Sequence, residues 1–97
     1  MPFRIDFDPQ ARADVASMRG FERAATLDTI QRILTQSPTM ISRSRIKRLR
    51  GLSSPEYRLR IGEIRVFYDV YEDEVYVLRI LPKDESDQYL KEMGHES

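Results

Sequence analysis

The sequence predicts an α+β domain: a small, mainly antiparallel sheet with an N-terminal helical hairpin and a C-terminal helix, in the order β-α-α-β-β-β-α. This prediction rests on two patterns. Apolar residues recur at helical spacing in segments 9–19 and 21–36, whereas segments 57–61, 64–71 and 75–81 are rich in the strand formers Val, Ile and Tyr. The 97 residues suffice for one domain, placed at 1–97, with its helices largely on one face of the sheet.

The N-terminal part predicts a strand followed by the helical hairpin. Residues 3–7 alternate apolar and charged side chains, which indicates a short strand. Asp8 is expected to cap the first helix, with Pro9 in its first turn, and Gly20 should separate the two helices. Pro38 stops the second helix. The residues expected to face the sheet are Ala11, Val15 and Met18 in the first helix, and Phe21, Ala24, Leu27, Ile30 and Leu34 in the second.

The C-terminal half predicts three consecutive strands. A loop at 39–44 and a stretch at 46–52 without an assigned structure precede them. Gly62 and Glu63 match a two-residue type II′ turn between the first two strands, because glycine stands in the leading position. Pro82 closes the last strand.

A final helix is expected over residues 84–93. Asp84 is the expected cap, and Gly94 follows the helix as glycine often does at this position. Tyr89 and Leu90 should pack this helix against the sheet.

Composition excludes several classes of function. The chain has no Cys and a single His, His95, which excludes disulfides, thiolate catalysis and sites built on paired histidines. Its apolar runs are far shorter than the ~20 residues of a membrane span, and its N-terminus has no secretory pattern. We therefore expect no cofactor, no metal and no membrane, and a cytoplasmic location.

A net charge of zero hides a strong separation of charge along the chain. Residues 41–65 hold eight basic and two acidic side chains, whereas residues 66–97 hold three basic and nine acidic ones. Most of the central cations are Arg, which binds phosphate through paired hydrogen bonds. The pattern favours a polyanion site over an ordinary solvated surface. The candidate contacts outside the strand pair at 57–71 are Arg43, Arg45, Lys47, Arg48, Arg50 and Arg79.

Strand alternation gathers three arginines on one face of the predicted sheet. A two-residue turn at 62–63 places Arg60 directly across from Arg65, and Arg58 across from Phe67. Like charges in directly opposed positions destabilise a strand pair, so we expect this arrangement to serve function. The alternative is that these arginines stack on Phe67 and Tyr71 or pair with nearby acids.

The position of Arg79 depends on the turn before its strand. A two-residue turn at 72–73 pairs Arg79 with Val66 on the core face, whereas a longer or bulged turn pairs it with Phe67. We favour the second register, because burying an unpaired Arg is costly.

At this level of detail the sequence resembles the RelE/ParE superfamily of toxins from bacterial toxin–antitoxin systems. The resemblance covers nearly the whole chain, including the strand before Asp8. The segment Lys47-Arg48-Leu49-Arg50-Gly51 and the run from Tyr57 to Val70, with its Arg-Val-Phe-Tyr, match the middle section of that superfamily. Lys83 and Tyr89 match its C-terminal basic residue and tyrosine in spacing and in type.

The resemblance implies roles for individual residues. In the RelE branch, which cleaves mRNA in the ribosomal A site, Arg58 and Arg60 fall where lysines often contact the RNA. Arg65 falls on the arginine that stabilises the scissile phosphate. Lys83 falls on a proposed general acid, and Tyr89 on a tyrosine that stacks on a base. Two arginines in place of lysines leave no evident general base, because Arg stays protonated.

Three functions follow as hypotheses. The first is a metal-independent, ribosome-dependent mRNA endonuclease that blocks translation and is neutralised by a cognate antitoxin in a hetero-oligomer. The second is a ParE-like inhibitor of DNA gyrase, suggested by the shared fold and the missing base. The third is a non-catalytic relic that only binds its antitoxin, suggested by the neutral net charge.

Two further expectations concern surfaces and stability. We expect the antitoxin contact to be largely apolar and to include Met18, Phe21, Leu90 and Met93, which leaves the isolated chain poorly soluble or dimeric. We also expect Arg65→Gln to abolish toxicity without lowering stability, because it relieves repulsion with Arg60.

Overall fold

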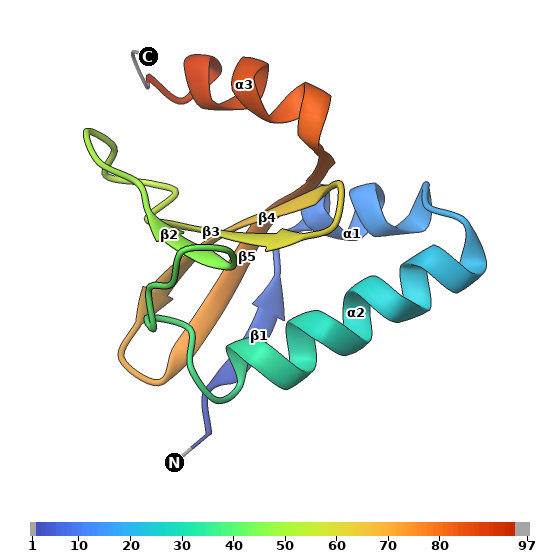
Figure 1. The fold of residues 1–97 in the computed structure, drawn as a ribbon, viewed down its shortest axis with the longest axis horizontal. Coiled ribbons are helices and arrows are strands. Elements are labelled where there is room, and N and C mark those ends of the chain that lie inside the picture. Colours follow the sequence, from blue (N-terminus) through green and yellow to red (C-terminus); the bar gives the residue numbers. More distant parts are fainter. Residues whose placement is uncertain (1, 95–97) are drawn as a thin grey trace.

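The computed structural model describes residues 2–94 and arranges them in three layers (Figure 1). The strands are β1 (Arg4–Phe7), β2 (Ile46–Arg48), β3 (Tyr57–Ile61), β4 (Ile64–Tyr71) and β5 (Glu74–Pro82). The helices are α1 (Pro9–Ala16), α2 (Gly20–Leu34) and α3 (Lys83–Glu92). The predicted α+β class is confirmed.

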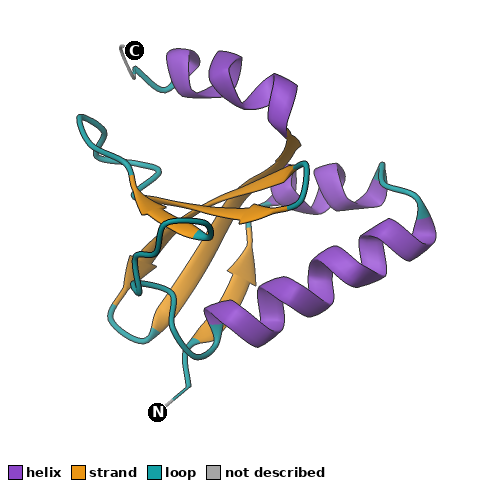
Figure 2. Ribbon diagram, viewed as in Figure 1, coloured by secondary structure: helices purple, strands orange, loops and turns teal. Residues whose placement is uncertain are grey.

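One five-stranded sheet, in the order β1-β5-β4-β3-β2, forms the middle layer (Figure 2). β1 runs parallel to β5, and the other neighbours are antiparallel. The edge strand β2 was missed in the sequence, where its three residues are too few to establish an alternating pattern. Its pairing with β3 sets Ile46 beside Leu59 and Lys47 beside Arg58.

The helices cover both faces of the sheet, which corrects the expectation that they pack largely on one. α1 and α2 lie on one face and α3 lies on the other (Figure 1). Alternation in β5 supplies both layers, since Ile80 belongs to the α1–α2 core and Leu81 to the α3 core. The α3 core is small and consists of Leu49, Phe67, Leu81 and Tyr89.

The helical hairpin differs from its predicted form at its ends and in its buried face. The Asp8 carboxylate caps α1 by accepting from the Gln10 backbone N–H (2.9 Å), as expected, but α1 ends at Ala16. In α2 the buried positions recur every four residues at Thr26, Ile30 and Leu34. The Phe21 side chain is 85% exposed. Phe21 precedes Ile30 by nine residues. Because each residue turns the helix by about 100°, the two side chains point to opposite sides of α2.

The final helix begins without the expected side-chain cap. α3 starts at Lys83, and its N-cap Pro82 offers no side-chain acceptor, so Asp84 is not the cap. Instead, the Lys83 backbone N–H donates to the Glu63 carbonyl in the β3–β4 turn (2.7 Å). Gly94 follows the helix with φ +99°, in agreement with the prediction. No described helix is both long and apolar enough to cross a bilayer.

A β-bulge in β5 decides the register of Arg79. The β4–β5 turn contains two residues, with Tyr71 opposite Glu74, yet Phe67 lies opposite Arg79 and Tyr68 opposite Val77. Leu78 is therefore the extra residue. The favoured pairing of Arg79 with Phe67 is confirmed, although the additional residue lies within the strand and not in the turn.

Candidate nucleic-acid interface

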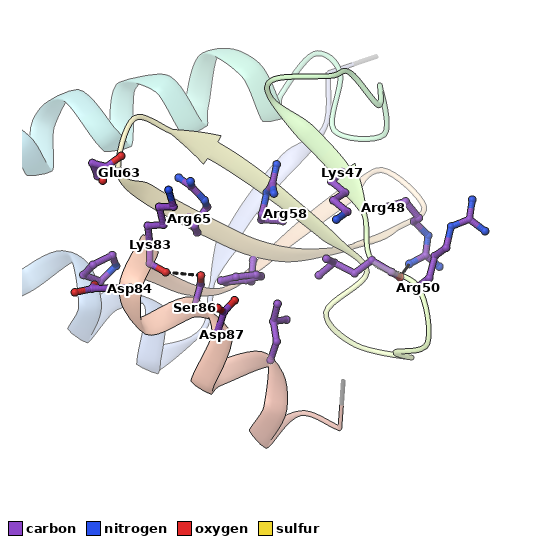
Figure 3. Close-up of a pocket in the computed structure, with 14 residues that line it drawn as sticks. Lys47, Arg48, Arg50, Arg58, Glu63, Arg65, Lys83, Asp84, Ser86 and Asp87 are labelled. Atoms are coloured by element: carbon purple, nitrogen blue, oxygen red, sulfur yellow. Dashed lines mark hydrogen bonds between the residues drawn. The ribbon is translucent and has the colours of Figure 1, made fainter. Parts of the chain in front are cut away.

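A groove with a volume of 810 Å³ lies between the sheet and α3 (Figure 3). Phe67 of β4 and Leu90 of α3 are apolar residues of its lining. Strands β2–β4 and the segment after β2 supply most of its cations, and α3 supplies one more. The cations that line it are Lys47, Arg48, Arg50, Arg58, Arg65 and Lys83.

Strand pairing produces this concentration of charge. The β3–β4 register sets Arg60 opposite Arg65 and Arg58 opposite Phe67, as the sequence predicts. β2 adds Lys47 directly beside Arg58. Gly62 has φ +56°, the left-handed conformation that allows the tight turn behind these pairs. One cation from each of three neighbouring strands thereby lines the groove: Lys47 of β2, Arg58 of β3 and Arg65 of β4.

The environment of Arg58 is unfavourable for its positive charge. Its Nε atom is buried and has no hydrogen-bond partner among the described residues. Burial lowers the pKa of the Arg58 guanidinium, and the positive charges of Arg65 and Arg60 lower it further. A buried donor without an acceptor is costly, and a phosphate oxygen would satisfy it.

Arg65 is held by the backbone of its own turn. Its side chain is 6% exposed. One terminal nitrogen, Nη1, donates to the carbonyls of Gly62 (2.9 Å) and Ile64 (3.1 Å). These contacts fix the guanidinium at the groove wall. Its partners are backbone carbonyls, whereas the alternative drawn from the sequence was an acidic or aromatic side chain.

Arg48 lines the groove but has a structural role. Its Nη1 donates to the carbonyls of Leu49 (3.0 Å) and Glu56 (2.9 Å), and its guanidinium lies over the Tyr57 ring at 5.2 Å. These contacts tie the segment after β2 to β3. By contrast, no carboxylate of residues 2–94 lies within ion-pair distance of Lys47, Arg50 or Lys83.

Several candidates from the sequence lie elsewhere. Arg43, Arg45 and Arg60 are exposed and lie outside the groove. Arg79 also lies outside it, because its Nε (2.8 Å) and Nη2 (3.0 Å) donate to the carboxylate of Asp14 in α1. Asp14 accepts from the Ile80 backbone N–H as well (2.8 Å).

Tyr89 is part of the α3 core in this structure. Its ring is 7% exposed and packs against Phe67 with centroids 5.0 Å apart, with the Arg79 guanidinium 5.6 Å from its centroid. Burial raises the pKa of the Tyr89 hydroxyl to about 12. The role in base stacking that the resemblance implies for Tyr89 stays a prediction.

Three carboxylates that sequence reasoning missed also line the groove: Glu63, Asp84 and Asp87. The spacing of Asp87, four residues after Lys83 on a helix, is a signal that would have placed both on one face. Among residues 2–94, no group of His, Cys, Asp or Glu has the arrangement of a metal site.

Comparison with known proteins identifies the family. The family model described as "ParE toxin of type II toxin-antitoxin system, parDE" matches residues 5–86. The chain belongs to this family. This toxin also shares its fold with solved RelE structures, which agrees with the RelE/ParE resemblance of the sequence. No curated protein matches the toxin at the level required for a significant relationship.

Three solved structures illustrate the shared fold. The RelBE2 toxin–antitoxin complex of Mycobacterium tuberculosis contains a chain that is 22% identical, with a TM-score of 0.71, covering 84% of this toxin and 99% of that chain. The RelE–RelB complex of Pyrococcus horikoshii contains a chain that is 23% identical, with a TM-score of 0.68, covering 86% of this toxin and 97% of that chain. Free Escherichia coli RelE carrying two substitutions is 20% identical, with a TM-score of 0.69, covering 96% of this toxin and 95% of that chain.

Proposed function

We propose that this toxin cleaves mRNA on the ribosome and that RNA lies in the groove between the sheet and α3. The observation that supports this most strongly is Arg58, whose buried Nε has no acceptor while neighbouring cations surround it. An RNA phosphate supplies the missing acceptor and the missing negative charge. Lys47 and Arg50, which have no ion pair among the described residues, extend the contact along the backbone.

The groove can stabilise cleavage by attack of a 2′-hydroxyl on the adjacent phosphate. Arg58 and Arg65 face the position where negative charge accumulates on the phosphorane. Arg65 is fixed there by its two carbonyl contacts, so little reorganisation is needed during the reaction. The Lys83 ammonium, which lies beside Arg65 in Figure 3, is the proton donor for the leaving 5′-oxygen.

A cognate antitoxin is the second partner in this proposal. The similar chains from M. tuberculosis and P. horikoshii are described as parts of toxin–antitoxin complexes. This toxin exposes Phe21 (85%) on α2 and Met93 (41%) after α3, and both are large apolar side chains open to solvent. Such side chains suit an apolar antitoxin contact. Phe21→Glu should weaken antitoxin binding without lowering the melting temperature.

The nuclease proposal is tested by paired substitutions on α3. Lys83→Gln removes the proposed acid and should slow cleavage of ribosome-bound mRNA by about 100- to 10,000-fold. Lys91→Gln removes the same charge from α3 outside the groove and should leave the rate unchanged. Expression of the wild-type toxin should arrest growth and leave cleaved messages. Intact messages in arrested cells would refute the nuclease function.

Inhibition of DNA gyrase is the second candidate, and two observations favour it. The matching family model is that of ParE toxins, and the Tyr89 ring, for which the resemblance implies base stacking, is buried in this structure. A supercoiling assay with purified gyrase separates the two functions. Inhibition by micromolar toxin, together with intact mRNA in growth-arrested cells, would establish the second.

A further inference from the structure

We propose that Asp87 of α3 is the general base for RNA cleavage, an inference that rests on the nuclease function proposed above. The reaction needs a group that accepts the proton of the attacking 2′-hydroxyl. The cations of the groove do not meet this need, because guanidinium and ammonium groups have no free electron pair to offer. The acceptor must therefore come from the carboxylates that line the groove.

The geometry selects Asp87 from the three carboxylates. Asp87 and Lys83 are four residues apart on α3, so they share one face of the helix, about one turn apart. In Figure 3 the Asp87 carboxylate points from α3 into the groove, whereas the Asp84 carboxylate points away from Arg58. Glu63 lies in the β3–β4 turn, at the end of the groove where its carbonyl accepts from the Lys83 N–H.

Asp87 and Lys83 thus form an acid–base pair on α3, in the same groove that Arg58 and Arg65 line. Arg58 and Arg65 hold the phosphate, and α3 presents a proton acceptor and a proton donor one helical turn apart. This separation suits an in-line displacement, in which the attacking and leaving oxygens lie on opposite sides of the phosphorus. No contact within 4.0 Å joins Lys83 to Asp87, so the two are not consumed by an ion pair with each other.

The step balances with these two residues alone. The 2′-hydroxyl gives its proton to an Asp87 carboxylate oxygen, and O2′ forms a bond to phosphorus. The bond between phosphorus and O5′ breaks, and O5′ takes a proton from the Lys83 Nζ. The products are a 2′,3′-cyclic phosphate and a 5′-hydroxyl, and proton exchange with water restores both side chains.

Asp87 has charged neighbours on its own helix and on the elements that line the groove. Any pH dependence of the reaction reflects this whole set and not Asp87 alone. On α3 itself the nearby charged groups are Lys83, Asp84 and Lys91; from the sheet and its connections they are Lys47, Arg48, Arg50, Arg58, Glu63 and Arg65.

The test compares Asp87→Asn with Glu85→Gln in single-turnover cleavage of ribosome-bound mRNA. Both variants remove one negative charge from an exposed position of α3, but Glu85 lies outside the groove, so only the first removes the proposed base. We expect Asp87→Asn to slow cleavage by about 100- to 10,000-fold and Glu85→Gln to slow it by less than about threefold. Binding to ribosomes programmed with a message carrying a 2′-deoxy residue at the cleavage position should be unchanged in both.

Asp87→Glu keeps a carboxylate, and it should restore part of the activity that is lost in Asp87→Asn. If Asp87→Asn is misfolded by circular dichroism, Asp87→Glu and Asp87→Ser replace it in the comparison. A wild-type toxin that cleaves, with Asp87→Asn equally active, overturns the role of Asp87 and leaves the nuclease function standing. A wild-type toxin that fails to cleave overturns both.

Discussion

Arg65→Gln tests whether the hydrogen bonds between Arg65 and its own turn stabilise the folded state. The wild-type side chain is 6% exposed, and its Nη1 donates to two turn carbonyls, at 2.9 and 3.1 Å. A hydrogen bond from a charged donor stabilises a protein by about 1.5–3 kcal/mol. Relief of the repulsion with the opposing Arg60 returns a few tenths to about 1 kcal/mol. We therefore expect a net loss of about 1–2 kcal/mol, which reverses the sign expected from the sequence.

The assay is thermal unfolding of the purified toxin, followed by the growth-inhibition assay on the same variant. A loss of this size lowers the melting temperature of a domain of this length by about 5–15 °C. Cleavage should also fall by about 100- to 1000-fold, because a donor to the transition state is lost.

Arg60→Gln is the matched control. It removes the other member of the opposed pair, but the Arg60 side chain is exposed and makes no side-chain hydrogen bond among the described residues. Its stability should stay the same or rise by a few tenths of a kcal/mol. If Arg65→Gln proves as stable as the wild type, the carbonyl contacts contribute nothing and the reasoning fails.

Three further substitutions test other parts of the fold. Asp14→Ala leaves the partly buried Arg79 and the Ile80 N–H without their acceptor, and should cost about 2–4 kcal/mol in denaturant unfolding; a loss below 1 kcal/mol would contradict this. The alanine side chain of Gly62→Ala meets no neighbouring atom, but its backbone must adopt φ +56°, so the variant should lose about 1–2 kcal/mol of unfolding free energy in the same assay. An unchanged denaturant midpoint would contradict the strain expected at this turn. Because the raised pKa of Tyr89 favours the protonated form in the folded state, stability should decline as pH rises from about 10 towards about 12, and Tyr89→Phe should flatten that decline in melting curves.

The β3–β4 pair shows why some of the site could be predicted from the sequence. A two-residue turn with a leading glycine fixes the register by itself, so the positions of Arg58, Arg60 and Arg65 follow from local rules. The fold class follows from the same short-range periodicities. The family resemblance rests on this region as well.

Long-range packing decided what the sequence did not predict. The sequence predicts Arg79 among the RNA contacts, whereas the carboxylate that it binds belongs to Asp14 of α1, 65 positions away in the chain. The resemblance implies base stacking for Tyr89, and only the packing of α3 on the sheet shows that its ring is buried against Phe67 in this structure. Asp87 went unnoticed because its relation to the groove depends on which face of the sheet α3 covers.

The parallel pairing of β1 with β5 has a consequence for synthesis of the toxin. Arg4 lies next to Glu74 in this pairing, so a ribosome adding about 5–20 residues per second needs about 4–14 s before the first strand can find its neighbour. α3, which provides Lys83, emerges later still. The groove that we propose for RNA can therefore form only after β5 and α3 have both left the ribosome.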